Sequence, residues 1–174
     1  MSLTIREKII RQFLLRAEAI TVAGGYSTNL GSNVFRATRS YDPKNLGALV
    51  IWPMPETATE KCYRVYECSM TMRVEGLAFY GEEDKSIVAE RMLGDMIRCF
   101  MSRTWTRDPE LTTDIAYKGG GTDTYPEEED KSVGAYAEFL VTYEMDLGEP
   151  EYEATGEIEE SIGLSESQAG ETDE

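Results

Sequence analysis

Residues 66–75 read YECSMTMRVE and alternate strictly between two kinds of side chain. One set is apolar or sulfur-containing and comprises Tyr66, Cys68, Met70, Met72 and Val74. The other set is polar and comprises Glu67, Ser69, Thr71, Arg73 and Glu75. Because successive side chains of a β-strand point to opposite faces, this pattern predicts a strand with one covered face and one wet face. Such strands are typical of an antiparallel sheet that is covered on one side.

A second long strand is expected at residues 133–147, VGAYAEFLVTYEMDL, which alternate in the same way. The predicted dry face is formed by Ala135, Ala137, Phe139, Val141, Tyr143 and Met145. Tyr136 and Leu140 fall on the otherwise polar face, which indicates that something else covers part of it. Shorter strands are expected at Val34–Arg39, Ala48–Trp52 and Ile115–Tyr117, and we expect the strand that begins at Ala48 to end at Pro53 and Pro55.

Two amphipathic helices are expected, because apolar residues recur every three or four positions over 4–20 and 84–102. The first stripe comprises Ile5, Ile9, Phe13, Ala17 and Ile20, widened by Ile10 and Leu14. The second comprises Ile87, Met92 or Leu93, Met96, Ile97, Phe100 and Met101. Ser2 or Thr4, and Asp84 or Ser86, are suitable N-caps. The sequence therefore predicts an α+β fold: an antiparallel sheet of about four or more strands, with two main helices packed on one face.

The negative charge is concentrated at the C-terminus. The chain of 174 residues has 33 acidic and 17 basic residues, a formal net charge of −16. Residues 149–174 contain ten of the acidic residues and no Lys or Arg, which leaves 23 acidic against 17 basic residues, a net of −6, in 1–148. Few large apolar residues accompany the acid, so we predict a folded domain at 1–148 and a flexible acidic C-terminal extension at 149–174.

The composition argues against several classes of function. The chain has no histidine, which removes the usual general base and the commonest metal ligand. Its cysteines, Cys62, Cys68 and Cys99, form no CxxC pair. No apolar run is long enough to span a bilayer, and the charged start of the chain does not suit a signal peptide. A surface this acidic also repels nucleic acid and anionic membranes.

Three groups of residues could in principle form chemical sites. Residues 118–132, KGGGTDTYPEEEDKS, are expected to form a loop, but they lack the order of a phosphate-binding loop. The acidic run 127–130 lacks the ligand spacing of a calcium-binding loop. The carboxylates on the polar faces of the two long strands fit cross-strand ion pairs or an interface better than acid–base catalysis. No catalytic, cofactor-binding or metal-ligating residue is therefore assigned.

Several segments resemble the tail terminator, or tail completion, proteins of tailed bacteriophages. These segments are TIREKIIRQF (4–13), GGYSTNLGSNVFRATR (24–39), ALVIWPMPE (48–56), DKSIVAERMLGDMI (84–97) and GGGTDTYPEEEDKSVGAYAEFLVTYEMDLGEP (119–150). The resemblance covers roughly residues 4–150 and rests on the order of elements and on these short strings. The acidic extension has no assigned counterpart in that family.

The resemblance implies a structural virion protein without a cofactor. Such proteins are small α+β domains that form a homohexameric ring on the head-proximal end of the tail tube, where the ring ends tube polymerisation and joins the tail to the neck. The implied partners are further copies of the chain, the tail tube protein, a head-tail connector or neck protein and, in a contractile tail, the sheath protein. The resemblance further implies that DNA passes through the ring without specific binding, that no membrane is involved, and that such a protein is located in the virion after assembly in the host cytoplasm.

We expect two polar, glycine-containing segments and part of the sheet to form the contact surfaces. The candidate interface residues are Tyr26, Thr28, Asn29, Leu30, Gly119, Gly120, Gly121, Thr122, Asp123, Tyr125, Tyr136 and Leu140. Two alternatives remain open at this point. One is another neck component, such as a head-tail connector or head-closure protein, and the other is a cytosolic enzyme that uses a carboxylate pair such as Glu67 and Glu138.

Overall fold

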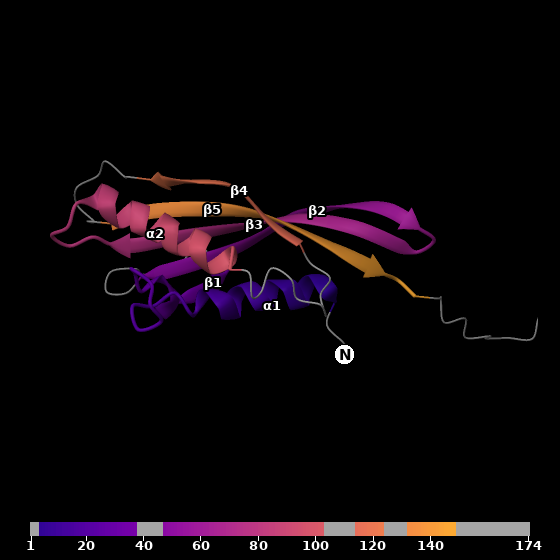
Figure 1. Ribbon diagram of the computed structural model, residues 1–174, viewed down its shortest axis with the longest axis horizontal. Helices are drawn as coiled ribbons and strands as arrows, with labels where there is room; N and C mark the ends of the chain where they lie inside the picture. Colours follow the sequence, from indigo (N-terminus) through magenta and orange to yellow (C-terminus); the bar gives the residue numbers. More distant parts are fainter. Residues whose placement is uncertain (1–3, 38–46, 103–113, 124–131, 149–174) are drawn as a thin grey trace, which may run out of the picture.

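The two alternating stretches form the central pair of strands in the sheet (Figure 1). In this computed structural model, which describes residues 4–37, 47–102, 114–123 and 132–148, β3 (Val65–Phe79) and β5 (Ser132–Asp146) pair in antiparallel register from Val65↔Asp146 to Phe79↔Ser132. The sheet order is β1-β2-β3-β5-β4, with β1 at Val34–Arg36, β2 at Ala48–Cys62 and β4 at Asp114–Asp123. Among the described strands, only β1 and β2 pair in parallel.

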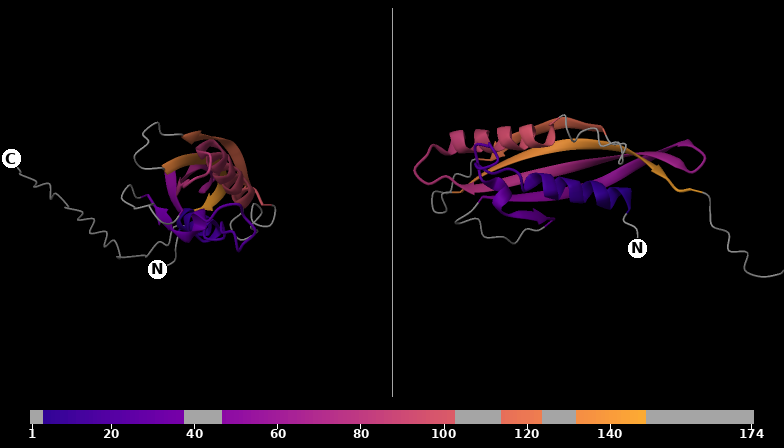
Figure 2. Two further views of the ribbon diagram at one scale, coloured as in Figure 1. Left: turned by 90° about the vertical axis from the view of Figure 1, so that its left-hand side faces the viewer. Right: turned by 60° about the horizontal axis from the view of Figure 1, so that its bottom comes forward.

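Both helices pack on the same face of the sheet, as predicted (Figure 2). Helix α1 (Ile5–Ala17) is capped by Thr4, and α2 (Lys85–Phe100) is capped by Asp84. Three phenylalanine rings from three elements meet in the core, Phe13 of α1, Phe100 of α2 and Phe139 of β5. Their centroids lie 5.0 to 6.3 Å apart, which joins both helices to the sheet through one cluster. The expected α+β class is confirmed.

The buried stripe of α2 differs from the predicted one. Its buried residues are Ala89, Met92, Asp95, Met96, Cys99 and Phe100. Ile87 is 51% exposed and does not belong to the core. The stripe is therefore rotated toward Asp95 and Cys99, because the loop after α1 packs on that side of the helix and donates hydrogen bonds to Asp95.

Strand β2 does not end at the prolines, which corrects the sequence prediction. It continues through Pro53 and Pro55 to Cys62. Strand β1 pairs with β2 only at residues 49–51, so within the described part of the chain the rest of β2 is an edge strand. An edge tolerates a residue that lacks an N–H, whereas the interior of a sheet does not.

The extended β2 forms a projection that we call the arm, made of residues 54–62 of β2, 65–69 of β3 and 142–146 of β5 (Figure 1). Every residue from 54 to 62 is exposed. The two-residue turn at its end, Tyr63 and Arg64, is called the tip. Cys68 and Tyr143 at the base of the arm still belong to the core, and the outer part of the arm extends three strands beyond the part of the sheet that the helices cover.

A β-bulge at the base of the arm redirects one carboxylate. The register shifts between Pro53 and Glu56, which places Glu56 opposite Met70 on the helix-covered side. There the hydroxyl of Tyr143 and the guanidinium of Arg6 both donate to Glu56 Oε2, the latter at 2.9 Å. Arg6 also donates to the carbonyl of Met54 at 3.1 Å. Glu56 thus links α1, β2 and β5 where the arm leaves the body.

Replacing Tyr143 with Phe should destabilise the fold in a pH-dependent way. The hydrogen bond from Tyr143 lowers the pKa of Glu56 below its ordinary 4.5, although burial opposes this shift. The hydrogen bond and the positive charge of Arg6 lower the pKa further. A lowered folded-state pKa means that ionised Glu56 stabilises the fold above about pH 4.5, and that this contribution is lost as the pH falls through the folded pKa. We expect Tyr143→Phe to cost about 1 kcal/mol at pH 7 and less at pH 3.

Urea unfolding of the wild type and the variant at both pH values measures this difference. Tyr117→Phe is the matched control, because Tyr117 is 39% exposed and its hydroxyl should contribute nothing at either pH. A difference between wild type and Tyr143→Phe that does not change with pH would contradict the proposed role of Glu56.

Candidate interaction surfaces

A buried carboxylate on α2 fixes the loop that follows α1. Asp95 is only 4% exposed. Its two oxygens accept hydrogen bonds from the backbone N–H of Ser27 at 3.1 and 2.9 Å, from the backbone N–H of Thr28 at 2.8 Å, and from the hydroxyl of Thr28 at 2.8 Å. A buried charge is tolerated when donors satisfy it in this way. Asp95 was not among the predicted site residues. An aspartate within the apolar stripe formed by Met92, Met96 and Cys99 could have indicated a buried carboxylate.

The loop residues divide between core and surface. Leu30 is fully buried, which corrects the expectation that it belongs to a contact surface. Gly31 lies so close to the end of α1 that an added Cβ would be 2.4 Å from the carbonyl oxygen of Ala17. Tyr26 is half-buried beneath Arg98, whose guanidinium carbon lies 4.9 Å from the ring centroid. Burial raises the pKa of the Tyr26 phenol.

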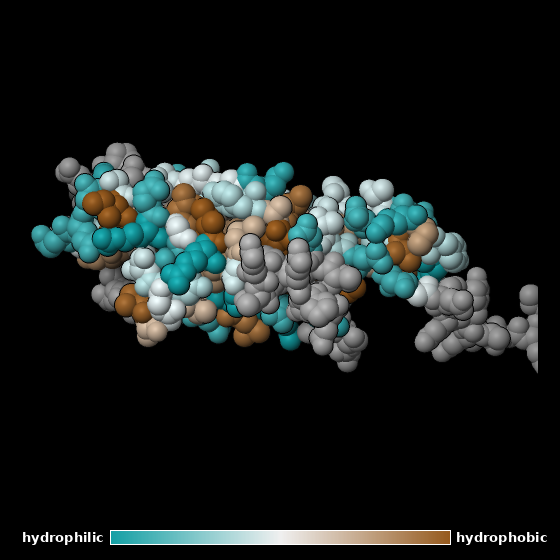
Figure 3. All heavy atoms as spheres, in the orientation of Figure 1, coloured by the Kyte–Doolittle hydropathy of each residue, from teal (hydrophilic) through white to brown (hydrophobic). Residues whose placement is uncertain are grey.

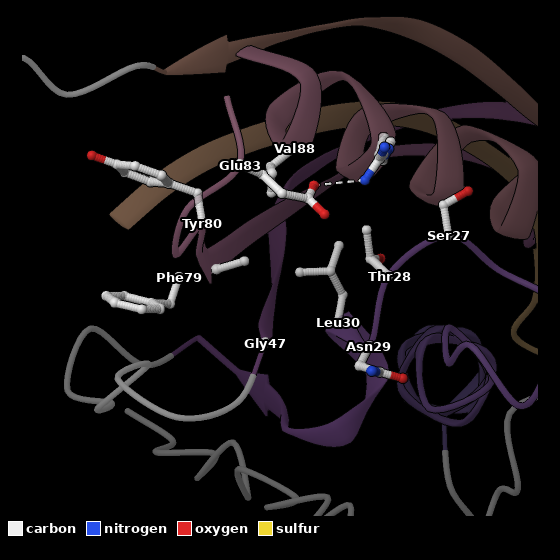
Figure 4. Close-up of a pocket in the computed structure, with 11 residues that line it drawn as sticks. Ser27, Thr28, Asn29, Leu30, Gly47, Phe79, Tyr80, Glu83 and Val88 are labelled. Carbon is white, nitrogen blue, oxygen red and sulfur yellow. Dashed lines mark hydrogen bonds and ion pairs between the residues drawn. The ribbon is translucent and has the colours of Figure 1, made fainter. Parts of the chain in front are cut away.

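Thr28 and Asn29 line a cavity of about 350 Å³, which we call the hollow (Figure 4). The hollow lies between the loop, the end of β3 and the first turns of α2. Its lining residues are Ser27, Thr28, Asn29, Leu30, Gly47, Ala78, Phe79, Tyr80, Glu83, Val88 and Arg91. Glu83 and Arg91 form an ion pair at 2.7 Å across one side. The hollow therefore combines apolar walls with a charged pair, and only its loop side was predicted.

The glycine run is part of a strand, which corrects the expectation of a loop at 118–132 for residues 118–123, while 124–131 lie outside the described residues. Gly119, Gly120 and Gly121 lie in the edge strand β4, opposite residues 136–138 of β5. A Cβ on Gly120 would lie 2.5 Å from the carbonyl oxygen of Tyr136 and 2.9 Å from Leu93 Cδ1. The run therefore allows close packing within the sheet. Thr122 and Asp123 end the strand, and Tyr125 lies outside the described residues.

Tyr136 and Leu140 lie on the face of the sheet opposite the helices, as predicted, and both are half-buried. Arg73 lies over the Tyr136 ring at 4.3 Å from its centroid. The same guanidinium forms ion pairs with Glu75 at 2.7 Å and with Glu138 at 3.1 Å. Cross-strand ion pairs on the polar face are thus confirmed. Since Arg and Tyr are enriched at interface hot spots, this ordered cluster is a candidate contact surface.

The sheet register separates the carboxylates that an enzyme would need. Glu67 is opposite Glu144, whereas Glu138 is opposite Arg73. Six residues of β3 separate the two positions, about 20 Å at ~3.3 Å per residue. Instead, Lys61 forms ion pairs with Glu144 at 3.1 Å and Glu67 at 3.8 Å. Glu67 and Glu138 are therefore not a catalytic pair.

The described ranges contain no group of three or more cysteine or carboxylate side chains that could hold a metal ion. Among these residues there is also no helix long and apolar enough to cross a membrane.

Comparison with known protein families finds no family that matches the chain, and a search of curated proteins finds no match.

Replacing Asp95 with Ala should release the loop. The variant leaves the N–H groups of Ser27 and Thr28 without their acceptor, and we expect it to lower the free energy of unfolding by about 2–4 kcal/mol. Hydrogen exchange at these two amides should rise further than exchange in β3 or β5. Asp95→Asn keeps one acceptor oxygen, so it should lower the free energy of unfolding by less than Asp95→Ala does.

Glu90→Ala is the matched control, because Glu90 lies on the exposed side of the same helix. We expect this change to stay within about 0.5 kcal/mol of wild type. Equal stability losses for Asp95→Ala and Glu90→Ala would show that the buried carboxylate does not hold the loop.

Proposed function

We propose that this protein is a structural subunit of the tail-terminator type from a tailed bacteriophage. In this proposal, copies of the chain form a ring, most simply a hexamer, at the head-proximal end of the tail tube. The ring ends polymerisation of the tube protein and presents a surface to a head-tail connector or neck protein, and in a contractile tail to the sheath. Its location is then the virion, at the junction of tail and neck.

The arm is the observation that carries this proposal. Residues 54–62 are exposed throughout, and Tyr63 at the tip is 79% exposed. The outer part of this three-stranded extension has no described helix over it. It has a use when another protein covers it, because exposed strands and edges otherwise invite unwanted pairing. Such a feature favours a protein that works by assembly.

The rest of the geometry is compatible with the same role. The α+β fold with both helices on one face of the sheet is the architecture that the resemblance implies. The face opposite the helices carries Tyr136 and the Arg73 cluster, which suit a contact with a neighbouring protein. Six copies would carry six times −16, a formal charge of −96, which suits a channel through which DNA passes without being held.

Electron microscopy of labelled virions tests the proposal. Virions that carry the chain are treated with a gold-conjugated antibody against it, and we expect gold at the tail–neck junction, with a ring at one end of isolated tail tubes. Label on isolated heads but on no tube end would favour a head-tail connector or head-closure protein. Absence of label from virions would overturn a virion role altogether.

The purified protein should not bind duplex DNA. The basic residues of α1 are partly used within the fold: Arg6 pairs with Glu56 at 2.9 Å, and Arg11 lies 3.5 Å from Glu7. Too few cations remain together for the several phosphate contacts that tight binding needs. Titration with duplex DNA at about 150 mM salt should show no binding tighter than about 1 μM. Salt-sensitive binding below that value would contradict the idea of a non-adhesive channel.

A further inference from the structure

Large apolar side chains are exposed at both ends of the molecule. At the arm end, Tyr63 is 79% and Leu147 is 48% exposed. At the other end, beside the hollow, Phe79 is 48% and Ile87 is 51% exposed. Figure 3 shows hydrophobic residues on the surface over α2 and again on the arm. The 15 residues of β3 run between these ends, about 50 Å at ~3.3 Å per residue.

The tip holds Tyr63 on a fixed turn. Arg64 has a positive φ of 63° and donates hydrogen bonds from its guanidinium to the carbonyls of Gly148 and Leu147, the latter at 3.3 Å. The N–H of Leu147 returns a bond to the carbonyl of Arg64 at 3.0 Å. The turn is thus tied to the end of β5. An aromatic side chain on an ordered turn loses little conformational entropy when it binds.

The hollow has the chemistry to accept a tyrosine. Phe79 and Val88 offer apolar surface for a ring, above the buried Leu30, and the Glu83–Arg91 pair offers a carboxylate and a guanidinium to a phenol hydroxyl. Figure 4 shows Glu83 meeting its ion-pair partner on α2 while Leu30 and Phe79 lie on the opposite side of the cavity. Tyrosine suits a site with one apolar part and one polar part.

One charge at the tip can complement the acids beside the hollow. Lys61 is already paired with Glu67 and Glu144, but Arg64 lies at the tip, and three consecutive acids, residues 82–84, lie beside the hollow. Such exposed charges add little affinity, but they favour one orientation of approach.

We infer that the tip of one copy docks into the hollow of a second copy, with Tyr63 as the anchor. The length of β3 keeps the tip and hollow of one chain apart, so the contact forms between chains. It joins two different surfaces, and head-to-tail contacts of this type produce a ring when the rotation between copies closes. The inference rests on the proposed function in one respect, because the contact between tip and hollow is taken to be the one that joins subunits of the proposed ring.

Cross-linking through the natural cysteine beside the tip tests this contact. Cys62 is exposed, whereas Cys68 and Cys99 are buried, and Ser27 is an exposed residue of the hollow. With a short bismaleimide, Ser27→Cys should give a ladder of linked dimers and larger products. Adding Cys62→Ser should abolish the ladder. The matched control Gln12→Cys places an exposed cysteine on the outer face of α1 and should give none, whereas equal ladders from both positions would overturn the inference.

Mixing two variants tests whether the contact is head to tail. Tyr63→Ser removes the anchor, and Phe79→Asp alters the wall of the hollow. Each alone should weaken self-association in sedimentation by about 30-fold or more, as expected for a hot spot. The mixture retains one intact tip and one intact hollow, so it should form dimers but no larger assembly. Wild-type association by Tyr63→Ser alone, or no dimers in the mixture, would overturn the inference.

The outcomes separate this inference from the proposed function. Gold label at the neck, together with normal association of Tyr63→Ser, would keep the function and reject this interface. Cross-linked copies without neck label would keep the interface and reject the function. If Tyr63→Ser prevents binding to tube ends but leaves self-association unchanged, the tip contacts the tube protein and the inference fails.

Discussion

The contact between Asp95 and the loop at 27–28 is the interaction on which much of the fold depends. A carboxyl group at 4% exposure is costly unless donors satisfy its oxygens, and here two backbone N–H groups and one hydroxyl do so. The contact ties the connection between α1 and β1 to α2. It thereby holds Leu30 in the core and gives the hollow one of its walls. A single polar contact thus joins the folding of the domain to the shape of a candidate binding surface.

The sequence predicted best those elements whose pattern is local. The alternation in β3 and β5 and the helical spacing in α1 describe the buried faces as they are, because a regular element repeats its environment at a fixed period. The length of β2 could not be predicted in this way. Proline ends a central strand, but whether β2 is central depends on how far β1 pairs with it, and that is a tertiary property. The glycines of β4 were misread for a similar reason, since their packing partners lie in β5 and α2.

Less of the candidate site could be predicted than of the fold. The polar segment around Thr28 and Asn29 led us to expect contact residues there, and both residues line the hollow. Leu30 was included in the same expected surface, although its side chain is buried in the core. The facing side of the hollow comes from the end of β3 and the start of α2, about 50 positions further along the chain. No periodicity relates such distant segments. The Arg73 cluster was partly predictable, because opposite charges on the polar faces of two adjacent strands meet once the strands are paired.

The prolines of β2 have a further consequence for the exposed strand edge of the arm. Pro53 and Pro55 together remove two backbone donors from the stretch where the arm leaves the body. A foreign strand that began to pair along this edge would meet missing hydrogen bonds there and could not continue into the body of the sheet. Pairing along the exposed edge of the arm would therefore stop at the prolines and would not spread into the body of the sheet. The residues that sequence rules assigned to the end of a strand act instead as a barrier to uncontrolled growth of the sheet.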